Sequence, residues 1–292
     1  MSKKASVLLL AAILLLAVSV SARAEVFINQ EAPEDWSERE LFRLIAIDTD
    51  RSDAMFLQCG GEAMLVDSGS GGYQDRLYEV ADAYGVTAFK YLYNTHTDND
   101  HIHAFKYLIE SQKYEIGMFT SPCGMDYVDP PGYHQIVMNA IRRYNVPYHV
   151  VEDGEELTLG GATMTVMRCM EPWGRNARSA TLMVTFGESR VFLTGDIDNL
   201  TMRHYVNKYG EEALRADILK SPHHGIATMP DEFIFAVNPK LVFVNNLEEN
   251  SKGFIIGMNY HAPGIELLFS GDASILMETD GTDWYVWQTT GK

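Results

Sequence analysis

The sequence has few cysteines, and those it has are far apart. Cys59, Cys123 and Cys169 are scattered and odd in number, and no C-x-x-C pair occurs. At most one disulfide can therefore form. We expect buried free thiols, because an unpaired cysteine behaves as a small hydrophobic side chain.

Long hydrophobic runs are also scarce. The one clear run, residues 7–20, follows Lys3 and Lys4 and is followed by Ala22-Arg23-Ala24, a small-x-small cleavage pattern. It is shorter than the ~20 residues that span a membrane. We therefore predict that residues 1–24 are a signal peptide, with an uncleaved anchor as the weaker alternative. The mature protein is expected to be secreted or periplasmic, with no stable membrane span.

Basic residues are outnumbered by acidic ones. The chain has 23 Lys and Arg against 40 Asp and Glu. Removing Lys3, Lys4 and Arg23 leaves 20 basic residues against the same 40, a net charge of −20. Nucleic acid is disfavoured as a partner, because gripping phosphates needs clustered Lys and Arg. A small phosphorylated substrate held by metal ions is not excluded.

The hydrophobic pattern predicts two halves, each with strands followed by helices. Leu77, Val80, Ala81 and Tyr84 have helical spacing that ends at Gly85. Further helices are predicted from Ile102, at 133–144 and near 231–236. Strands are predicted at 41–47, 55–58, 63–66, 89–93, 116–120, 148–151, 163–169, 180–186, 190–193, 216–220, 241–245, 265–269, 275–278 and 284–288.

No linker separates the halves, so we predict one domain over residues 25–292. The pattern fits an α/β fold, a four-layer αβ/βα sandwich in which two sheets pack together and helices cover the outside. The segments 121–132 and 247–257 are interpreted as loops that set specificity.

One segment concentrates side chains that can bind metal. His96, Asp98, Asp100 and His101 follow a predicted strand. In an extended segment alternate side chains share a side, so His96, Asp98 and Asp100 can converge. Helix capping would account for an Asp or Asn here, but it does not account for two histidines.

Two later strand ends carry further candidates. Asp196 lies in Leu193-Thr194-Gly195-Asp196, and His223 and His224 lie in Lys220-Ser221-Pro222-His223-His224-Gly225. Ligands bind at the carboxyl ends of strands in α/β sheets. Either motif alone is weak evidence, but the three in this order are specific.

Together these motifs resemble those of metallo-β-lactamase-fold hydrolases, whose pattern is H-x-H-x-D-H, then a later Asp and a later His. The resemblance is closer to the hydrolase domain of ComEC-type competence proteins, which has H-x-D-x-D-H, Leu-Thr-Gly-Asp and Lys-x-Pro-His-His-Gly. Phosphorylcholine esterases of the same fold are a second similar group. The resemblance extends over most of the mature chain and includes Asp67, an aspartate with a largely structural role.

The resemblance implies a site for two metal ions. His96 and Asp98 would hold one ion, and Asp100 and His101 the other. Asp196 would bridge them. One of His223 and His224 would complete the second site; we favour His224 as the ligand and place His223 beside the substrate. Two ions ~3.5–4 Å apart can generate a hydroxide near neutral pH and clamp the reacting oxygens.

Two departures from the β-lactamase pattern bear on the chemistry. Asp98 stands where those enzymes have a histidine, and no histidine lies between His149 and His204, where they have another ligand. The first site is thus expected to be weak, or only the second filled, and β-lactamase activity is disfavoured. Zn²⁺ suits these ligands, and the oxygen of Asp98 also admits Mn²⁺.

Two further histidines have open roles. His261, in Asn259-Tyr260-His261, is similar in position to a late histidine of the ComEC-type domains. It could donate to a phosphate oxygen or be an ordinary loop residue. His103 stands where the relatives usually have glycine, and support of a metal ligand, substrate contact and simple exposure all remain open.

The sequence therefore predicts an exported metal-dependent hydrolase that uses a metal-bound hydroxide on a phosphoester or phosphodiester, with Asp100, His223 and His261 as catalytic residues. The expected partner is a small-molecule or cell-envelope phosphoester. The alternative is a metal-binding sensor or surface-interaction protein without catalysis. The oligomeric state is left open.

Overall fold

The structure is a computed structural model that describes residues 23–128, 130–171, 173–226 and 228–288. The predicted signal peptide lies outside the described residues except for Arg23 and Ala24. Within the described part of the chain no helix has the length and apolar character needed to cross a bilayer. Cys59 and Cys169 are buried free thiols, as predicted, whereas Cys123 is only partly buried.

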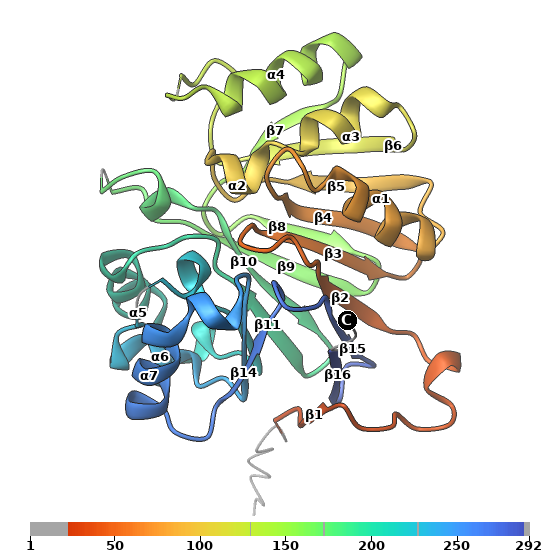
Figure 1. Cartoon of the computed structure of the whole chain (residues 1–292). Helices are drawn as coiled ribbons and strands as arrows, with labels where there is room; N and C mark the ends of the chain where they lie inside the picture. Colours follow the sequence, from red (N-terminus) through yellow and green to blue (C-terminus); the bar gives the residue numbers. More distant parts are fainter. Residues whose placement is uncertain (1–22, 129, 172, 227, 289–292) are drawn as a thin grey trace, which may run out of the picture.

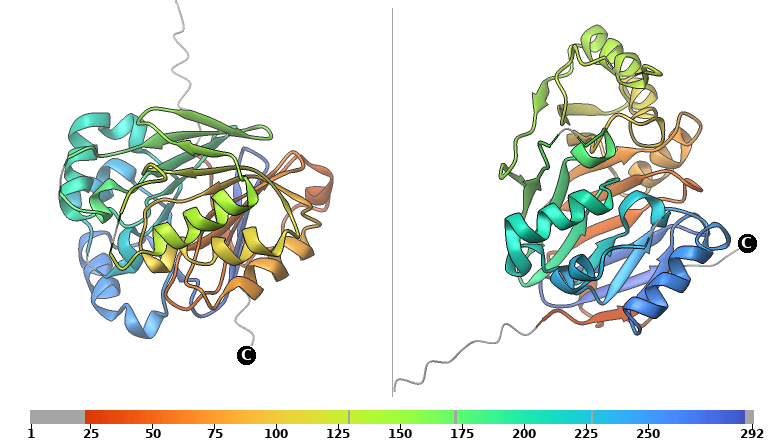
Figure 2. Two further views of the ribbon diagram at one scale, coloured as in Figure 1. Left: turned by 90° about the horizontal axis from the view of Figure 1, so that it is seen from above. Right: turned by 90° about the vertical axis from the view of Figure 1, so that its left-hand side faces the viewer.

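Two sheets pack face to face, with helices on both outer sides (Figures 1 and 2). The described part of the first sheet has the order β1 (Val26–Ile28), β16 (Trp284–Gln288), β15 (Ile275–Thr279), β2 (Phe42–Ala46), β3 (Ala54–Cys59), β4 (Glu62–Ser68), β5 (Ala88–Tyr93), β6 (Glu115–Ser121) and β7 (Tyr148–Val150). The second has the order β14 (Glu266–Phe269), β13 (Leu241–Val244), β12 (Ile218–Lys220), β11 (Ser189–Leu193), β10 (Thr181–Phe186), β9 (Ala162–Met167) and β8 (Glu156–Leu159).

The helices divide between the two outer faces. The first sheet is covered by α1 (Gln74–Ala83), α2 (Asn99–Ile102), α3 (Phe105–Ser111) and α4 (Tyr133–Tyr144). The second is covered by α5 (Asn199–Leu214), α6 (Asp231–Val237) and α7 (Lys252–His261). Short 3₁₀ turns occur at Trp36–Glu38, Asn176–Arg178, Pro222–Gly225 and Glu248–Asn250.

Alternation along the strands creates three hydrophobic layers. In β2, Phe42 and Leu44 face the core between the sheets, whereas Ile45 faces the core under α1, α3 and α4. A third core joins the second sheet to α5, α6 and α7. Successive side chains of a strand point to opposite faces, so a strand covered on both sides must be apolar on both. The predicted four-layer α/β sandwich is confirmed.

The element predictions hold for α1, α4 and the predicted strands, with ends shifted by a few residues. The helix predicted from Ile102 is two short helices, α2 and α3. The strands β1 and β8 were not predicted.

The segment predicted as the loop 247–257 is instead a 3₁₀ turn followed by α7. Gly253 and Gly257 made the sequence pattern unlike that of a helix, because each glycine costs about 1 kcal/mol of helix propensity relative to alanine. Burial of Phe254 and Met258, one helical turn apart, overrides that cost.

The two sheets meet where β5 and β11 end. The backbone N–H of Ala180 donates to Thr95 O (2.9 Å), and the Tyr93 hydroxyl donates to Ala180 O (3.2 Å). Gly195 has φ +51°, and a Cβ there would lie 3.0 Å from the Thr95 side chain. Only glycine combines this backbone conformation with such a close approach, so the ends of the two strands stay adjacent.

The helix α6 offers a direct test of the layered core. Phe233 is fully buried against the second sheet, whereas Phe235 is 65% exposed. We predict that Phe233→Ala lowers the free energy of unfolding by about 3–5 kcal/mol. Phe235→Ala, two residues away on the same helix, should change it by less than about 0.5 kcal/mol. Urea unfolding of both variants measures this, and equal losses would contradict the assigned packing.

Candidate metal centre

The segment after β5 turns directly into α2 and carries four candidate side chains. Asp98 is the N-cap residue of α2, but its side chain makes no capping hydrogen bond. Its carboxylate is 3.8 Å from His96 Nε2. Helix capping therefore does not explain Asp98.

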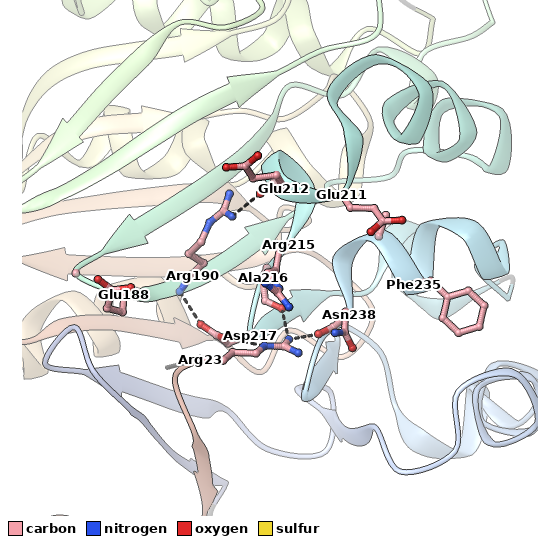
Figure 3. Close-up of a pocket in the computed structure, with 12 residues that line it drawn as sticks. Arg23, Glu188, Arg190, Glu211, Glu212, Arg215, Ala216, Asp217, Phe235 and Asn238 are labelled. Atoms are coloured by element: carbon pink, nitrogen blue, oxygen red, sulfur yellow. Dashed lines mark hydrogen bonds and ion pairs between the residues drawn. The ribbon is translucent and has the colours of Figure 1, made fainter. Parts of the chain in front are cut away.

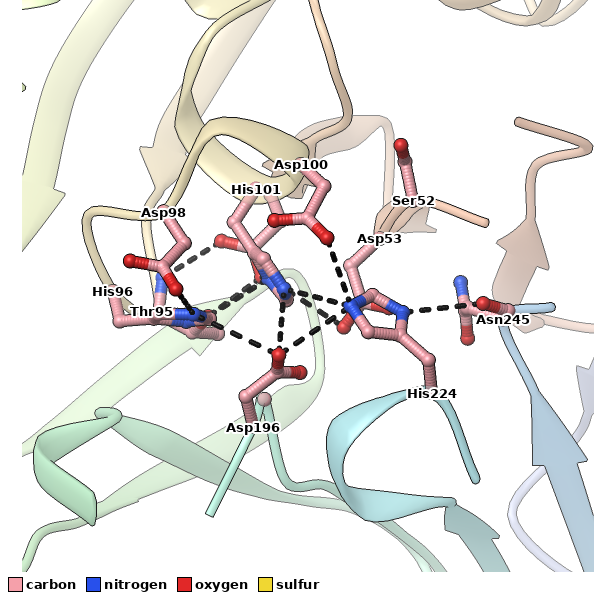
Figure 4. A network of polar contacts seen from close by, with 12 residues as sticks. Ser52, Asp53, Thr95, His96, Asp98, Asp100, His101, Asp196, His224 and Asn245 are labelled. Atoms are coloured by element: carbon pink, nitrogen blue, oxygen red, sulfur yellow. Dashed lines mark hydrogen bonds and ion pairs between the residues drawn. The ribbon is translucent and has the colours of Figure 1, made fainter. Parts of the chain in front are cut away.

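Ring nitrogens and carboxylates from distant segments converge on Asp196 (Figure 4). Its Oδ2 atom lies 3.3 Å from His101 Nε2 and 3.4 Å from His224 Nε2. His224 Nε2 is also 3.3 Å from Asp100 Oδ2. Three parts of the chain, after β5, β11 and β12, thus present ligand atoms to one small volume, as the sequence predicted for these positions.

A second group of ligand atoms shares the same aspartate. His96 Nε2 is 3.8 Å from Asp196 Oδ2 and at the same distance from Asp98 Oδ2. His96 Nε2 is buried and makes no hydrogen bond within the described part of the chain. A buried ring nitrogen normally has a partner, so its orientation toward two carboxylates fits a metal ligand. The residues present fit Zn²⁺ or Mn²⁺ in kind, with Asp196 between both groups.

The opposite ring nitrogen of His101 is held by a buried carboxylate. His101 Nδ1 is 2.7 Å from Asp67 Oδ2. Asp67 also accepts from the backbone N–H of Thr95 (2.7 Å) and from its hydroxyl (2.6 Å). A carboxylate behind a metal-binding histidine fixes its tautomer and leaves Nε2 free for an ion. Asp67 therefore positions the segment after β5.

Asp53 lies behind His224, whose Nδ1 atom is also 3.1 Å from Asn245 O, and it was missed by the sequence reasoning. Asp53, His101, Asp196 and His224 offer atoms within 4.8 Å of one another. However, Asp53 faces the Nδ1 atom of His224 (3.2 Å) and the Nζ atom of Lys220 (2.5 Å). We therefore place it behind the histidines. Nothing in the local sequence distinguishes Asp53 from a surface aspartate.

The cluster shifts the pKa of its histidines in opposite directions. Burial and the neighbouring His101 lower the pKa of His96 well below its usual value. Burial alone would also lower the pKa of His101 and His224, but Asp196 and Asp53 raise it well above. His96 is therefore neutral, whereas a metal ion must displace protons from the other two rings.

Lys220 is a fully buried cation within this group. Burial opposes its charge, yet Asp53 and Asp196 raise its pKa. Its Nζ donates to Gly195 O (2.8 Å) and lies 3.5 Å from Asp196 Oδ1. Lys220 lies in one of the quoted motifs, but sequence reasoning gave it no role.

His223 lies at the mouth of the cluster. His223 and His224 both have positive φ, at 48° and 52°. His223 is 41% exposed, and its Nε2 is 3.7 Å from Asp196 Oδ2 and 3.4 Å from Asn176 Nδ2. The buried His224 suits a ligand and the half-buried His223 suits a substrate contact.

Arg175 lies just before residues 176–180, the region in which the resemblance would place a further histidine of the β-lactamases. Its Nη1 atom is 3.0 Å from Asp98 Oδ1, and it donates to Pro130 O (3.2 Å). Arg175 thus joins the loop 121–132 to the metal cluster. Sequence reasoning noted the missing histidine but missed the arginine next to it.

Two predicted residues have other surroundings. His261 ends α7, and its Nδ1 lies 2.7 Å from Asp231 Oδ1 at the start of α6. The structure does not bring it into the cluster, so its contacts give no support to the predicted catalytic role. His103 lies beside the cluster and packs between Gly71, Asn99 and Tyr133.

A separate recess of about 550 Å³ lies at the other end of β12 (Figure 3). Arg23 lines it and bonds to Asp217, Ala216 O and Asn238 O. Asp217 precedes β12 whereas Lys220 at its far end contacts Asp196. This recess is therefore distinct from the metal cluster.

A family model of the metallo-β-lactamase superfamily matches residues 47–229. The chain therefore belongs to this superfamily, as a metallohydrolase whose substrate is unassigned. The matched range contains the 96–101 segment, Asp196, His223 and His224, but not His261. No curated protein sequence matches significantly.

Solved structures show the same fold. YhfI from Bacillus subtilis, a metallo-β-lactamase fold protein, is similar with a TM-score of 0.52 and 12% identity, over 86% of this chain and 100% of that one. CmlA, a diiron β-hydroxylase from Streptomyces venezuelae, is similar with a TM-score of 0.50 and 14% identity, over 82% of this chain and 54% of that one. At such identities the likeness concerns the fold.

The carboxylate behind His101 can be tested by its effect on metal affinity. We predict that Asp67→Asn weakens Zn²⁺ binding by about 10–100-fold, because it removes the charge that orients His101. Asp75→Asn, at an exposed position in the first turn of α1, is the control. Competition with a chromophoric chelator measures both affinities. Equal affinities for the two variants would show that Asp67 does not support the site.

Proposed function

We propose that the mature protein is an exported hydrolase of phosphoesters or phosphodiesters that works with two metal ions, Zn²⁺ or Mn²⁺. The observation that carries this proposal is the pair formed by Asp98 and Arg175 at 3.0 Å. A carboxylate in place of a histidine adds a hard oxygen ligand. The guanidinium beside it has the geometry that recognises phosphate oxygens.

We assign the ligands in two groups that share Asp196. His96 and Asp98 form the first, and Asp100, His101 and His224 form the second. The distances from Asp196 Oδ2 to His96, His101 and His224 support this division, at 3.8, 3.3 and 3.4 Å. One protein that is similar in fold over 54% of its own chain, CmlA, is a diiron β-hydroxylase.

When bound, the ions would lower the pKa of a water molecule and neutralise charge on the phosphate oxygens. In the hydrolysis, water adds to phosphorus, the bond to the ester oxygen breaks, and the alcohol leaves with a proton. Arg175 would hold a non-bridging oxygen, and His223 would contact the ester oxygen at the mouth. His261 is not assigned a step, because it pairs with Asp231.

The proposal of a ComEC-like branch rests on the three motifs of the sequence. Export rests on the signal-like residues 1–24. The net acidity and the absence of a basic cluster in the quoted motifs favour a small-molecule or cell-envelope phosphoester over nucleic acid.

The second candidate is a metal-binding protein without catalysis. The observation that favours it is the composition of the first group, which holds one histidine, His96, and faces Arg175 where a further neutral ligand stands in β-lactamases. Metal analysis of the purified mature protein separates the candidates. Two tightly bound ions support the hydrolase, and one or none supports the non-catalytic protein.

Metal binding should be visible as thermal stabilisation. Zn²⁺ at 1,000 times its dissociation constant stabilises by about 4 kcal/mol, which corresponds to a rise in Tm of about 10 °C for a domain of this size. We predict this shift for the chelator-stripped protein, measured by scanning calorimetry. Asp196→Ala should abolish it, whereas Asp126→Ala, whose side chain is 99% exposed, should keep it.

Asp100 provides the test of catalysis. With Zn²⁺ or Mn²⁺ the wild type should cleave an aryl phosphodiester such as bis(p-nitrophenyl) phosphate. We predict that Asp100→Ala lowers kcat by ~10²-fold or more, the loss typical of removing one group that stabilises the transition state. Glu79→Ala, an exposed carboxylate on α1, is the control. A kcat of Asp100→Ala within a few-fold of the wild-type value would reject the assignment.

A further inference from the structure

A recess of about 340 Å³ opens directly beside His223. Its walls come from the two segments that follow Asp196 and precede His224. The residues that line it, besides His223, are Ile197, Asp198, Asn199, Leu200, Met202 and Pro222. A ligand in this recess would therefore lie next to the metal centre.

The recess and the metal centre share one wall, the His223 side chain. His223 Nε2 is 3.7 Å from Asp196 Oδ2, while the same residue lines the recess. A substrate that reaches from the metal centre into the recess would therefore pass along the His223 side chain.

The lining is suited to an apolar group. Ile197 and Met202 are buried beneath it, and Leu200 stands at its rim with 57% of its surface exposed. The carboxylate of Asp198 is turned to α5, where it accepts from the N–H and the hydroxyl of Thr201, both at 2.9 Å. Among the described lining residues none is lysine or arginine, so the recess is not a phosphate site.

The cationic side of the mouth is formed by other residues. Arg175 contacts Asp98, and its neighbour Asn176 contacts His223 Nε2 at 3.4 Å. A substrate would therefore place its anionic group near Arg175 and the metal ligands, and its apolar arm in the recess. An exposed leucine at such a rim costs little to desolvate and gains apolar contact when covered.

We propose that this recess binds the hydrocarbon arm of the substrate, so that the enzyme prefers phosphoesters of alkyl or aryl alcohols over those of small polar ones. This inference rests on the proposed phosphoester hydrolysis and names the substrate class of the same site. Burial of the arm would contribute about fourfold in affinity for each methylene removed from water.

Kinetics on two monoesters that differ only in the alcohol test the preference. For the zinc-loaded mature protein, kcat/KM for hexyl phosphate, measured by phosphate release, should exceed that for methyl phosphate by about tenfold or more. Leu200→Asp should bring this ratio close to one. Ile256→Asp, a 71% exposed residue on α7 outside the recess, should leave the ratio unchanged. A wild-type ratio near one would overturn the proposal.

Binding of phosphonates separates the failure of this inference from that of the proposed function, because it needs no turnover. Calorimetry should show hexylphosphonate binding about tenfold or more tightly than methylphosphonate, and Leu200→Asp should remove the difference. Such discrimination without hydrolysis of any phosphoester would support the recess and reject the hydrolase. Equal affinities, or no binding of either, would overturn the recess as a substrate site.

Discussion

The charge balance among buried carboxylates is the constraint on which the site depends. Asp53, Asp67 and Asp196 are almost fully buried, and removing a carboxylate from water costs several kcal/mol unless a cation or donors compensate. Lys220 supplies one buried cation, 2.5 Å from Asp53. The remaining negative charge is balanced by the protonated rings of His101 and His224 when no metal is bound, or by metal ions. Without cations in the cluster, this arrangement of buried carboxylates would therefore destabilise the folded state.

The junction between the two sheets brings the charged side chains of the site together. Asp67 is the next-to-last residue of β4, the 96–101 segment follows β5, and Asp196 follows β11 of the other sheet. The hydrogen bond from Ala180 to Thr95 and the close approach of Gly195 to Thr95 bring these ends together. Because both sheets are packed on two faces, the ligand atoms are carried by rigid elements, which keeps them in place before an ion binds.

The mouth of the centre combines a charged pair with an apolar recess. Asp98 is paired with Arg175, and His223 stands between the metal ligands and an apolar recess. In the proposed function the inner residues would hold the ions, and the mouth would decide which ester reaches them. This separation is expected of the fold, because loops at the strand ends vary while the sandwich beneath them stays the same.

The sequence by itself determined the layered fold and most of the inner site. Strand alternation predicts the sandwich, and the short spacing from His96 to His101, with Asp196 and His224 at later strand ends, predicts the cluster. Only the tertiary structure decided the roles of Asp53 and Arg175. Each contacts site residues that are distant in the sequence, and neither lies in a recognisable sequence motif. Tertiary packing also stabilises α7 by burying its apolar side chains, and it pairs His261 with Asp231. Residue spacing predicts which residues that are close in the sequence share a face or a site. Contacts between residues distant in the sequence are set by tertiary packing.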